Sequence, residues 1–201
     1  MTTTDDAPRV GDQRPGGRAA RVRADVLAAT VELLDQVGYD DLSFDEVARR
    51  AGVHRTTVYR RWPTKPELVA DATNVHSDEH VPVPDSGSLR ADLRALAASV
   101  AANVSTPGGA RRSRSIVAAA ATSEQLADDV SNLMRRRVDL TKVIVERATE
   151  RGEVGDHIDP ALVIEAVVAP IWFRLLLSGE VIDDEFLDGV VDLAMSGISP
   201  G

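Results

Sequence analysis

A glycine-containing turn between two short helical segments is the feature that most restricts how this chain can fold. Ser43 and Glu46 form a capping box, which predicts the start of the first helix. Gly52 ends that helix, a second helix follows at about 55–62, and Pro63 stops it. Two short helices joined by a tight turn that contains glycine predict a helix-turn-helix.

The two faces of the predicted 55–62 helix differ in chemistry. One face is apolar and can pack against the preceding helix; the bracing residues are Val47, Ala51, Val53, Val58 and Trp62. The opposite face carries guanidinium groups, a methyl-bearing hydroxyl and a phenol, which suit base edges and phosphates in the major groove. The residues on this face are Arg55, Thr56, Tyr59 and Arg60. We therefore predict that this helix binds double-stranded DNA.

Residues 18–73 resemble the N-terminal domain of the tetracycline-repressor (TetR) family. The resemblance is carried by the segments AATVELLDQVGYDDLSFDEVARRAGV and HRTTVYRRWPTKPELV. It implies an all-helical homodimer with a small-molecule pocket in the C-terminal domain. It also implies that a set of residues contacts DNA: Ser43, Arg55, Thr56, Thr57, Tyr59, Arg61 and Lys65. Among these, the resemblance places Tyr59 and Lys65 at phosphates.

Three positions in this region allow more than one interpretation. His54 stands where the family usually has a small hydroxyl residue that caps the recognition helix, so it either caps less well or contacts phosphate. Trp62 is better interpreted as a core residue. Tyr59 could also be a core residue, but its hydroxyl is expected on the side that faces the groove.

Arginines outside the second helix are also candidates for DNA contacts. Arg18, Arg21 and Arg23 open the first predicted helix, and they are either a solvated helix start or an arm that binds phosphate or the minor groove. We retain Arg18 as a DNA-binding candidate. Arg49 and Arg50 end the helix before the turn, where a solvated C-terminus and a phosphate contact are equally compatible with the sequence.

Turn residues and charge divide the chain into three parts. We predict a disordered arm at 1–17, a helix-turn-helix domain at 18–76 and a helical ligand-binding and dimerisation domain at 77–201, with a linker at 77–87 that contains prolines and a glycine. Residues 1–75 carry 11 basic and 12 acidic side chains, whereas residues 76–201 carry 12 basic and 20 acidic ones. The net charge of −9 therefore lies mainly outside the predicted DNA-binding domain.

Five further helices are predicted in the C-terminal part, and no strand pattern competes with them. In the N-terminal part, the predicted helix that begins near Arg18 ends at Gly38. A fourth N-terminal helix begins at the Thr64 capping box and runs to about His76. The segment Thr106-Pro-Gly-Gly109 is interpreted as an interruption between helices. The expected C-terminal helices are 88–104, 110–121, 124–151, 160–179 and a last one from the Asp183 cap. The fold class is therefore all-α.

The apolar segment 169–177 indicates a ligand or dimer role for the last two helices. Pro170 is expected to kink its helix. The segment resembles the last-but-one helix of one type of TetR-family C-terminal domain, which implies a four-helix bundle formed by 160–178 and 184–197 of two subunits. A core-only role is the alternative for Trp172 and Phe173. We assign ligand-facing positions to Met134, Trp172, Phe173 and Leu176.

Composition excludes several other classes of protein. The chain has no cysteine, so disulfides and thiolate metal sites are excluded. His76 and His80 stand four residues apart but straddle the predicted linker, so no metal site is assigned. No catalytic triad, phosphate loop or cofactor motif stands out, so we expect neither an enzyme nor a cofactor. No apolar run is expected to approach the roughly 20 residues that span a bilayer, which predicts a cytoplasmic protein without membrane partners.

Two functions from different classes fit these patterns. The first is a transcription regulator, a repressor that a small-molecule effector releases from a palindromic operator. The second is an all-helical small-molecule-binding protein whose helix-turn-helix has become structural. The exposed set Arg55, Thr56, Tyr59 and Arg60 favours the first, because a structural remnant has no reason to keep these groups together. An activator and a regulator without a ligand remain open.

Overall fold

A computed structural model describes residues 17–198, and within this range the chain forms ten α-helices, one π-helix and no strand. The all-α prediction is confirmed. The predicted arm lies outside the described residues except for Gly17, which is the first residue of α1. The elements are α1 (Gly17–Val37), α2 (Phe44–Arg50), α3 (Arg55–Arg61), α4 (Lys65–His80), α5 (Leu89–Ser105), α6 (Pro107–Ala120), α7 (Glu124–Thr141), α8 (Val143–Glu150), α9 (Pro160–Phe173), η1 (Arg174–Ser178) and α10 (Asp184–Ile198).

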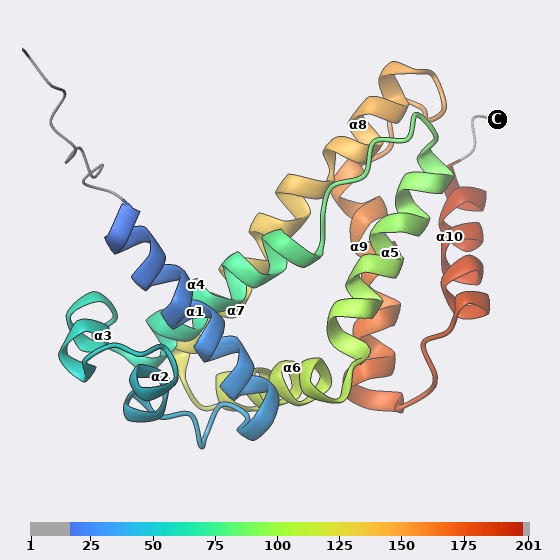
Figure 1. The fold of residues 1–201 in the computed structure, drawn as a ribbon. Coiled ribbons are helices and arrows are strands. Elements are labelled where there is room, and N and C mark those ends of the chain that lie inside the picture. Colours follow the sequence, from blue (N-terminus) through green and yellow to red (C-terminus); the bar gives the residue numbers. More distant parts are fainter. Residues whose placement is uncertain (1–16, 199–201) are drawn as a thin grey trace, which may run out of the picture.

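The helices gather around two buried clusters, one at each end of the molecule (Figure 1). Helices α1 to α4 form one end, α5, α8, α9 and α10 form the other, and α6 and α7 lie between them. The N-terminal cluster includes Val26, Val47 and Val58, and also Ile116 from α6 and Leu126 from α7. The predicted DNA-binding helices are therefore packed directly on two helices of the C-terminal part.

Helix α4 continues into the segment that was predicted as a linker. It ends at His80 rather than at about His76, and irregular chain begins at Val81. Asp78 on the added turn forms ion pairs with Arg136 and Arg137 of α7. These contacts hold the last turn of α4 against its neighbour, so tertiary packing extends the helix beyond the local pattern.

Helix α6 begins at Pro107, within the segment that was interpreted as an interruption. The Thr106 hydroxyl caps it by accepting from the Gly109 amide at 3.0 Å. A Cβ on Gly109 would lie 2.3 Å from the Asn103 carbonyl oxygen, so the glycine permits a close approach to α5. The predicted interruption is present but is confined to Thr106, and α6 begins at Pro107 rather than at about Ala110, because the glycines lie within the helix and serve packing rather than a turn.

The predicted 124–151 helix is two helices, α7 and α8, that meet at Lys142. The Thr141 hydroxyl donates back to the carbonyl oxygens of Arg137, at 2.7 Å, and Val138, at 3.3 Å. Such back-bonding competes with the helical ladder and bends helices. The hydrophobic pattern continues across this point, which is why the sequence suggested one helix.

The predicted 160–179 helix runs through Pro170 and becomes the π-helix η1. Gly179 ends it in the left-handed region at φ +70°, and the Asp183 carboxylate caps α10 by accepting from the Phe186 amide at 2.9 Å. The Arg114 guanidinium of α6 donates to the Leu175 carbonyl at 2.9 Å. This contact ties α6 to the π-helix.

One helical segment is more apolar than expected. Residues Pro160–Ser178 are 19 in number with a mean hydropathy of 1.9, enough by length and composition to cross a membrane. The expectation that no run approaches this length was wrong. The segment nevertheless buries one side in the protein core, through Val163, Ile164, Val167 and Ile171.

Candidate functional site

The apolar side of α3 is held by α2 and α4. Val47 and Val58 are fully buried, and Trp62 is 5 % exposed. The Trp62 indole donates to the Asp71 carboxylate of α4 at 3.0 Å, which satisfies its only polar group. Trp62 is thus a core residue, as interpreted from the sequence. Its packing fixes α3 so that the other side of the helix faces outwards.

The outward side of α3 presents four side chains to solvent: Arg55, Thr56, Tyr59 and Arg60. The Tyr59 ring is 41 % exposed and packs edge-on against the Phe44 ring, with centroids 4.4 Å apart. Arg55 pairs with Asp45 at 3.0 Å and lies over the Tyr59 ring at 5.0 Å. Thr56 and Arg60 have no side-chain partner within residues 17–198. This surface offers guanidinium, hydroxyl and phenol groups at one place, as the groove of DNA requires.

The other predicted DNA-binding residues lie at the edges of this surface. Ser43 caps α2 by accepting from the Glu46 amide at 3.3 Å. The Lys65 ammonium donates to the carbonyl oxygens of Tyr39 and Asp40, both at 3.0 Å. Thr57 is half-buried. The Arg61 guanidinium lies 5.4 Å from the centroid of the Trp62 ring.

His54 occupies the N-cap position of α3 but makes no side-chain capping hydrogen bond. The first amides of α3 therefore lack the side-chain acceptor that Ser43 and Thr64 provide for α2 and α4. The His54 side chain is exposed, so the structure does not show it in the capping role.

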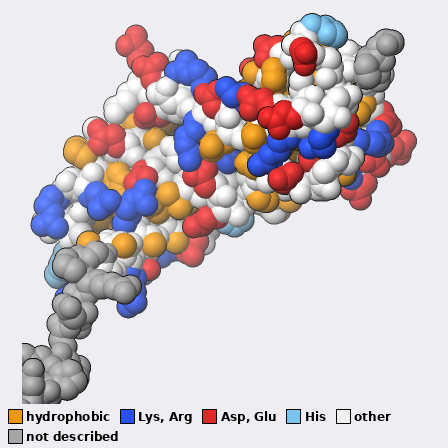
Figure 2. Space-filling model, turned by 90° about the horizontal axis from the view of Figure 1, so that it is seen from above, with side chains coloured by type: hydrophobic (Ala, Val, Ile, Leu, Met, Phe, Trp, Pro, Cys, Tyr) orange, Lys and Arg blue, Asp and Glu red, His pale blue; other side chains and the backbone are white. Residues whose placement is uncertain are grey.

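At the start of α1 the three arginines differ. Arg23 pairs with Asp71, the same carboxylate that binds the Trp62 indole. Arg18 and Arg21 are exposed and have no partner in the described part of the chain. Figure 2 shows basic side chains gathered over the N-terminal helices, whereas basic and acidic side chains lie side by side over the C-terminal ones. Arg18 and Arg21 are therefore available to an external partner.

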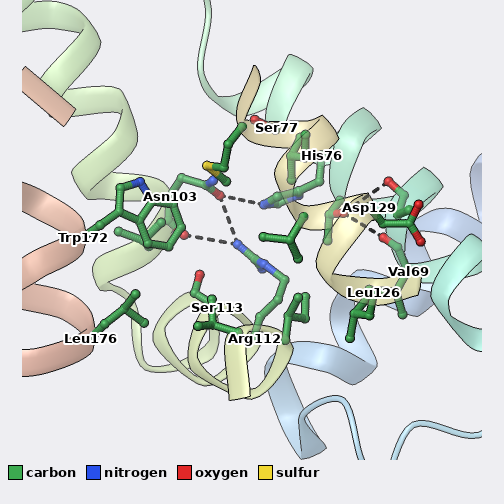
Figure 3. Close-up of a pocket in the computed structure, with 18 residues that line it drawn as sticks. Val69, His76, Ser77, Asn103, Arg112, Ser113, Leu126, Asp129, Trp172 and Leu176 are labelled. Atoms are coloured by element: carbon green, nitrogen blue, oxygen red, sulfur yellow. Dashed lines mark hydrogen bonds between the residues drawn. The ribbon is translucent and has the colours of Figure 1, made fainter. Parts of the chain in front are cut away.

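Two cavities lie between the C-terminal helices and α4. The first, about 290 Å³, is bounded by α4, α5, α6, α7 and the α9–η1 segment, and we call it the α6 cavity (Figure 3). The second, about 530 Å³, lies between α5, α7 and α9, and we call it the α5 cavity. Asn103, Met134 and Trp172 line both. Cavities of this size suit small organic molecules, whose sites span about 300–1,000 Å³.

A polar cluster in the α6 cavity joins four helices. The buried Arg112 of α6 pairs with Asp35 of α1 and donates to the carbonyl and side-chain oxygens of Asn103 at 3.2 and 3.1 Å. The His76 imidazole of α4 lies 2.8 Å from the same Asn103 side-chain oxygen. Burial first, and then the charges of Arg112 and His80, lower the pKa of His76. The cluster connects the cavity lining to the DNA-binding helices.

The sequence reasoning did not find this cluster. Its members are spread over positions 35 to 112, and no spacing marks them as a group. The only local signal was the close packing implied by Gly108 and Gly109 beside Arg112, which was interpreted as a helix break.

The four predicted ligand-facing residues are not all in the cavities. Met134 and Trp172 line both cavities, and Leu176 lines the α6 cavity. Phe173 lines neither of them and is 57 % exposed. It belongs instead to an exposed apolar face of α9 and α10, made up of Leu162, Phe173, Leu177, Val181 and Leu193.

The two histidines of α4 stack with ring centroids 4.0 Å apart. Within residues 17–198 no group of three or more histidine, aspartate or glutamate side chains is arranged to hold a metal ion. His80 Nδ1 instead lies 2.8 Å from the His76 carbonyl oxygen.

Comparisons with known proteins agree with this geometry. A family model described as the tetracyclin repressor-like C-terminal domain matches residues 83–194, and the model of bacterial regulatory proteins of the tetR family matches residues 26–72. The HTH-type transcriptional regulator AqdR of Rhodococcus erythropolis is 34% identical over 192 residues, which cover 94% of this chain and 91% of AqdR. The DNA-binding transcriptional repressor TetR of Mycobacteroides abscessus is 32% identical, over 84% of this chain and 89% of its own.

Solved structures show the same fold. The TetR family transcription regulator SCO0332 superposes with a TM-score of 0.77 at 32% identity, over 90% of this chain and 100% of that one. The fatty acid degradation regulator FadR of Bacillus halodurans has a TM-score of 0.69, over 87% of this chain and 98% of its own. At 13% identity, that second likeness concerns the fold alone.

Proposed function

The chain belongs to the TetR family of bacterial DNA-binding transcriptional regulators, a non-enzymatic family, and from this premise we propose that it is a repressor released from a palindromic operator by a small-molecule effector. The observation that carries the proposal is the buried contact between Arg112 in the α6 cavity and Asp35 of α1. It gives an occupant of the cavity a direct connection to the DNA-binding helices. The relative from Mycobacteroides abscessus is named as a repressor.

We assign DNA recognition to the outward side of α3. Arg55, Thr56, Tyr59 and Arg60 reach base edges and phosphates, and the residues at the edges position the helix on the backbone. The edge residues are Arg18, Ser43, Thr57, Arg61 and Lys65. Under this proposal, residues 18–76 read DNA and residues 77–201 carry the cavities and the dimer interface, in the cytoplasm.

The exposed apolar face of α9 and α10 supports a homodimer. Leu177 and Leu193 are each 76 % exposed, and large exposed apolar patches on soluble chains often mark interaction sites. Pairing the two faces of two subunits covers these side chains in a four-helix bundle. In such a dimer, a palindromic operator requires the two α3 helices to lie about one DNA turn apart, or a small multiple of it.

The effector releases the repressor from the operator only if it binds the two states of the dimer with different affinity. We propose that an occupied cavity favours a spacing of the two α3 helices that no longer matches the operator. We propose that the polar cluster of the α6 cavity transmits the effect of the effector, because any displacement of Arg112 acts on α1 through Asp35.

Fluorescence anisotropy with the DNA that flanks the gene of this protein tests the proposal. We expect tight binding to one fragment, and we expect an extract of small metabolites to weaken that complex. If no compound or extract weakens a verified operator complex, the effector model fails while DNA binding stands.

A further inference from the structure

The α6 cavity contains a buried cation with unused hydrogen-bond donors. A guanidinium has five N–H donors. Arg112 is 5 % exposed and lines the cavity, and its contacts to Asp35 and Asn103 use Nη1 and Nη2 only. Figure 3 shows its guanidinium in the middle of the lining residues. An oxygen acceptor inside the cavity can therefore still bond to Arg112.

A second unused polar group lies beside it. Ser113 is 8 % exposed, and its hydroxyl has no hydrogen-bond partner among the described residues. In Figure 3 this hydroxyl points into the space between Trp172 and Arg112. Arg112 and Ser113 thus offer adjacent, unused hydrogen-bonding capacity at the cavity wall, which indicates a place for a polar atom of an occupant.

The rest of the lining is mostly apolar. The side chains around the space include Ile116, Val117, Leu133, Met134, Trp172 and Leu176. The acidic member of the lining is Asp129, whose Oδ2 is buried without a partner and whose pKa is raised, first by burial. Figure 3 shows it at the α4 end with its carboxylate turned away from Arg112. An occupant with an apolar body and one oxygen-bearing end fits this distribution of groups.

We propose that the effector is an apolar molecule with an acceptor-oxygen head group, a carboxylate or a carbonyl, that binds Arg112 and Ser113 in the α6 cavity. This inference rests on the proposed function and specifies its effector. The carboxylate is the stronger form of this head group, because hydrogen bonds between ionised partners are roughly twice as strong as neutral ones.

A carboxylate in the cavity competes with Asp35 for the same guanidinium. The Asp35 side chain is 32 % exposed, so water can solvate it when the contact breaks, whereas the Arg112 side chain at 6 % exposure needs a partner in the protein. Exchange of one carboxylate for the other therefore keeps the buried charge paired. It removes the ion pair between α6 and α1, which is one of the contacts that connect the cavity to the N-terminal helices.

Three probes of one shape and different head groups test the head-group chemistry. These are 2-naphthoate, 2-acetylnaphthalene and 2-naphthylmethylamine, titrated into the full chain by calorimetry without DNA. We expect 2-naphthoate to bind at least tenfold more tightly than the amine, with the ketone between them. Equal or tighter binding of the amine overturns the proposal, and so does failure of both oxygen-bearing probes to bind.

Two variants locate the binding. Asp35→Asn removes the competing carboxylate and is expected to tighten 2-naphthoate binding severalfold, a gain that misfolding cannot produce. Arg112→Met is expected to abolish it. Arg111→Gln is the matched control, because Arg111 is exposed and donates to the Asp35 backbone carbonyl, and binding should stay unchanged. Unchanged or weaker binding in Asp35→Asn overturns the competition.

The result of these titrations can be distinguished from a failure of the proposed function. The titrations contain no DNA, so they report on the cavity alone. Binding of 2-naphthoate without loss of operator affinity contradicts release by this effector class and leaves the head-group assignment intact.

Discussion

Arg55 is not free before DNA arrives. It pairs with Asp45 of α2 and donates to the Tyr59 hydroxyl at 3.4 Å. Both partners of the ion pair are more than 60 % exposed, and such pairs contribute about 0–1 kcal/mol. A DNA phosphate can therefore replace Asp45, at a small cost that is subtracted from the binding energy.

Asp45→Asn should consequently strengthen DNA binding. Removing the carboxylate frees Arg55 for phosphate and lowers repulsion, so we expect a few-fold tighter binding at low salt. Asp41→Asn is the matched control, since it removes the same charge from an exposed position that forms no ion pair with Arg55. Equal gains in the two variants, measured by anisotropy, would show that only net charge matters.

His76 should make stability depend on pH. Its pKa is lowered by burial and then by the charges of Arg112 and His80, so the folded protein takes up this proton less readily than the unfolded chain. As the pH falls through the ordinary histidine range near about 6.5, the unfolded state gains the proton first and the free energy of unfolding decreases.

The measurement is urea unfolding of the wild type and of His76→Gln at about pH 7.5 and about pH 5. The variant should lose less stability than the wild type on acidification, because the carboxylates whose pKa is lowered, such as Asp78, titrate below this window. An identical loss in both proteins contradicts the assignment to His76.

At the scale of helices, the sequence predicted the capped helix starts better than it predicted whether a segment forms one helix or two. The Ser43 and Thr64 hydroxyls both cap their helices as predicted, because an N-cap is a local interaction between residues three apart. The start of α6 and the division at Lys142 were not predicted. Both depend on contacts beyond the local pattern: the approach of Gly109 to α5, and the back-bonding of Thr141.

The functional surfaces divide in the same way. The outward side of α3 was predictable, because helical spacing alone separates Val58 and Trp62 from Arg55 and Tyr59. The cluster of Asp35, His76, Asn103 and Arg112 was not, because its four residues come from four helices. Sequence spacing carries no information on how separate helices pack around one arginine.

Gly109→Ala tests the close packing of α6 on α5. The added Cβ would lie 2.3 Å from the Asn103 carbonyl oxygen, so the helices must separate. We expect a loss of about 1–3 kcal/mol in the free energy of unfolding, as for other overpacked sites.

Gly197→Ala is the control for that variant. A Cβ there meets nothing within 4 Å, so the alanine should be neutral or stabilise α10 by up to about 1 kcal/mol. Similar effects of the two substitutions in chemical denaturation would mean that α6 does not approach α5 as closely as described.

At the scale of the whole molecule, the proposed dimer depends on the apolar face of α9 and α10. Leu177→Glu places a charge in the proposed four-helix bundle, so we expect the dimer to dissociate at micromolar concentration to the mass of one chain, 21.5 kDa. Leu140→Glu on α7 is the control, because Leu140 is 41 % exposed but lies outside this face. Sedimentation equilibrium distinguishes the dimer from the monomer. A wild-type protein that is a monomer at micromolar concentration would contradict the proposed dimer.

The distribution of charge explains how an acidic chain can bind DNA. Most of the negative charge lies outside residues 1–75, whereas the outward side of α3 keeps its arginines exposed. The cavities lie between the two, and Arg112 connects them to α1. Under the proposed function, DNA recognition, effector binding and dimer assembly occupy separate surfaces of one molecule.

The central claim, that α3 reads an operator through its outward side, is tested most directly by comparing wild type with Arg60→Ala. Anisotropy is measured on the operator and on unrelated DNA of equal length, over a range of salt concentrations. We predict that the variant loses about 1–3 kcal/mol of operator binding, roughly 5- to 150-fold, with a smaller loss on unrelated DNA. Equal affinity of the wild type for both DNAs, or an Arg60→Ala variant that binds the operator unchanged, would contradict it.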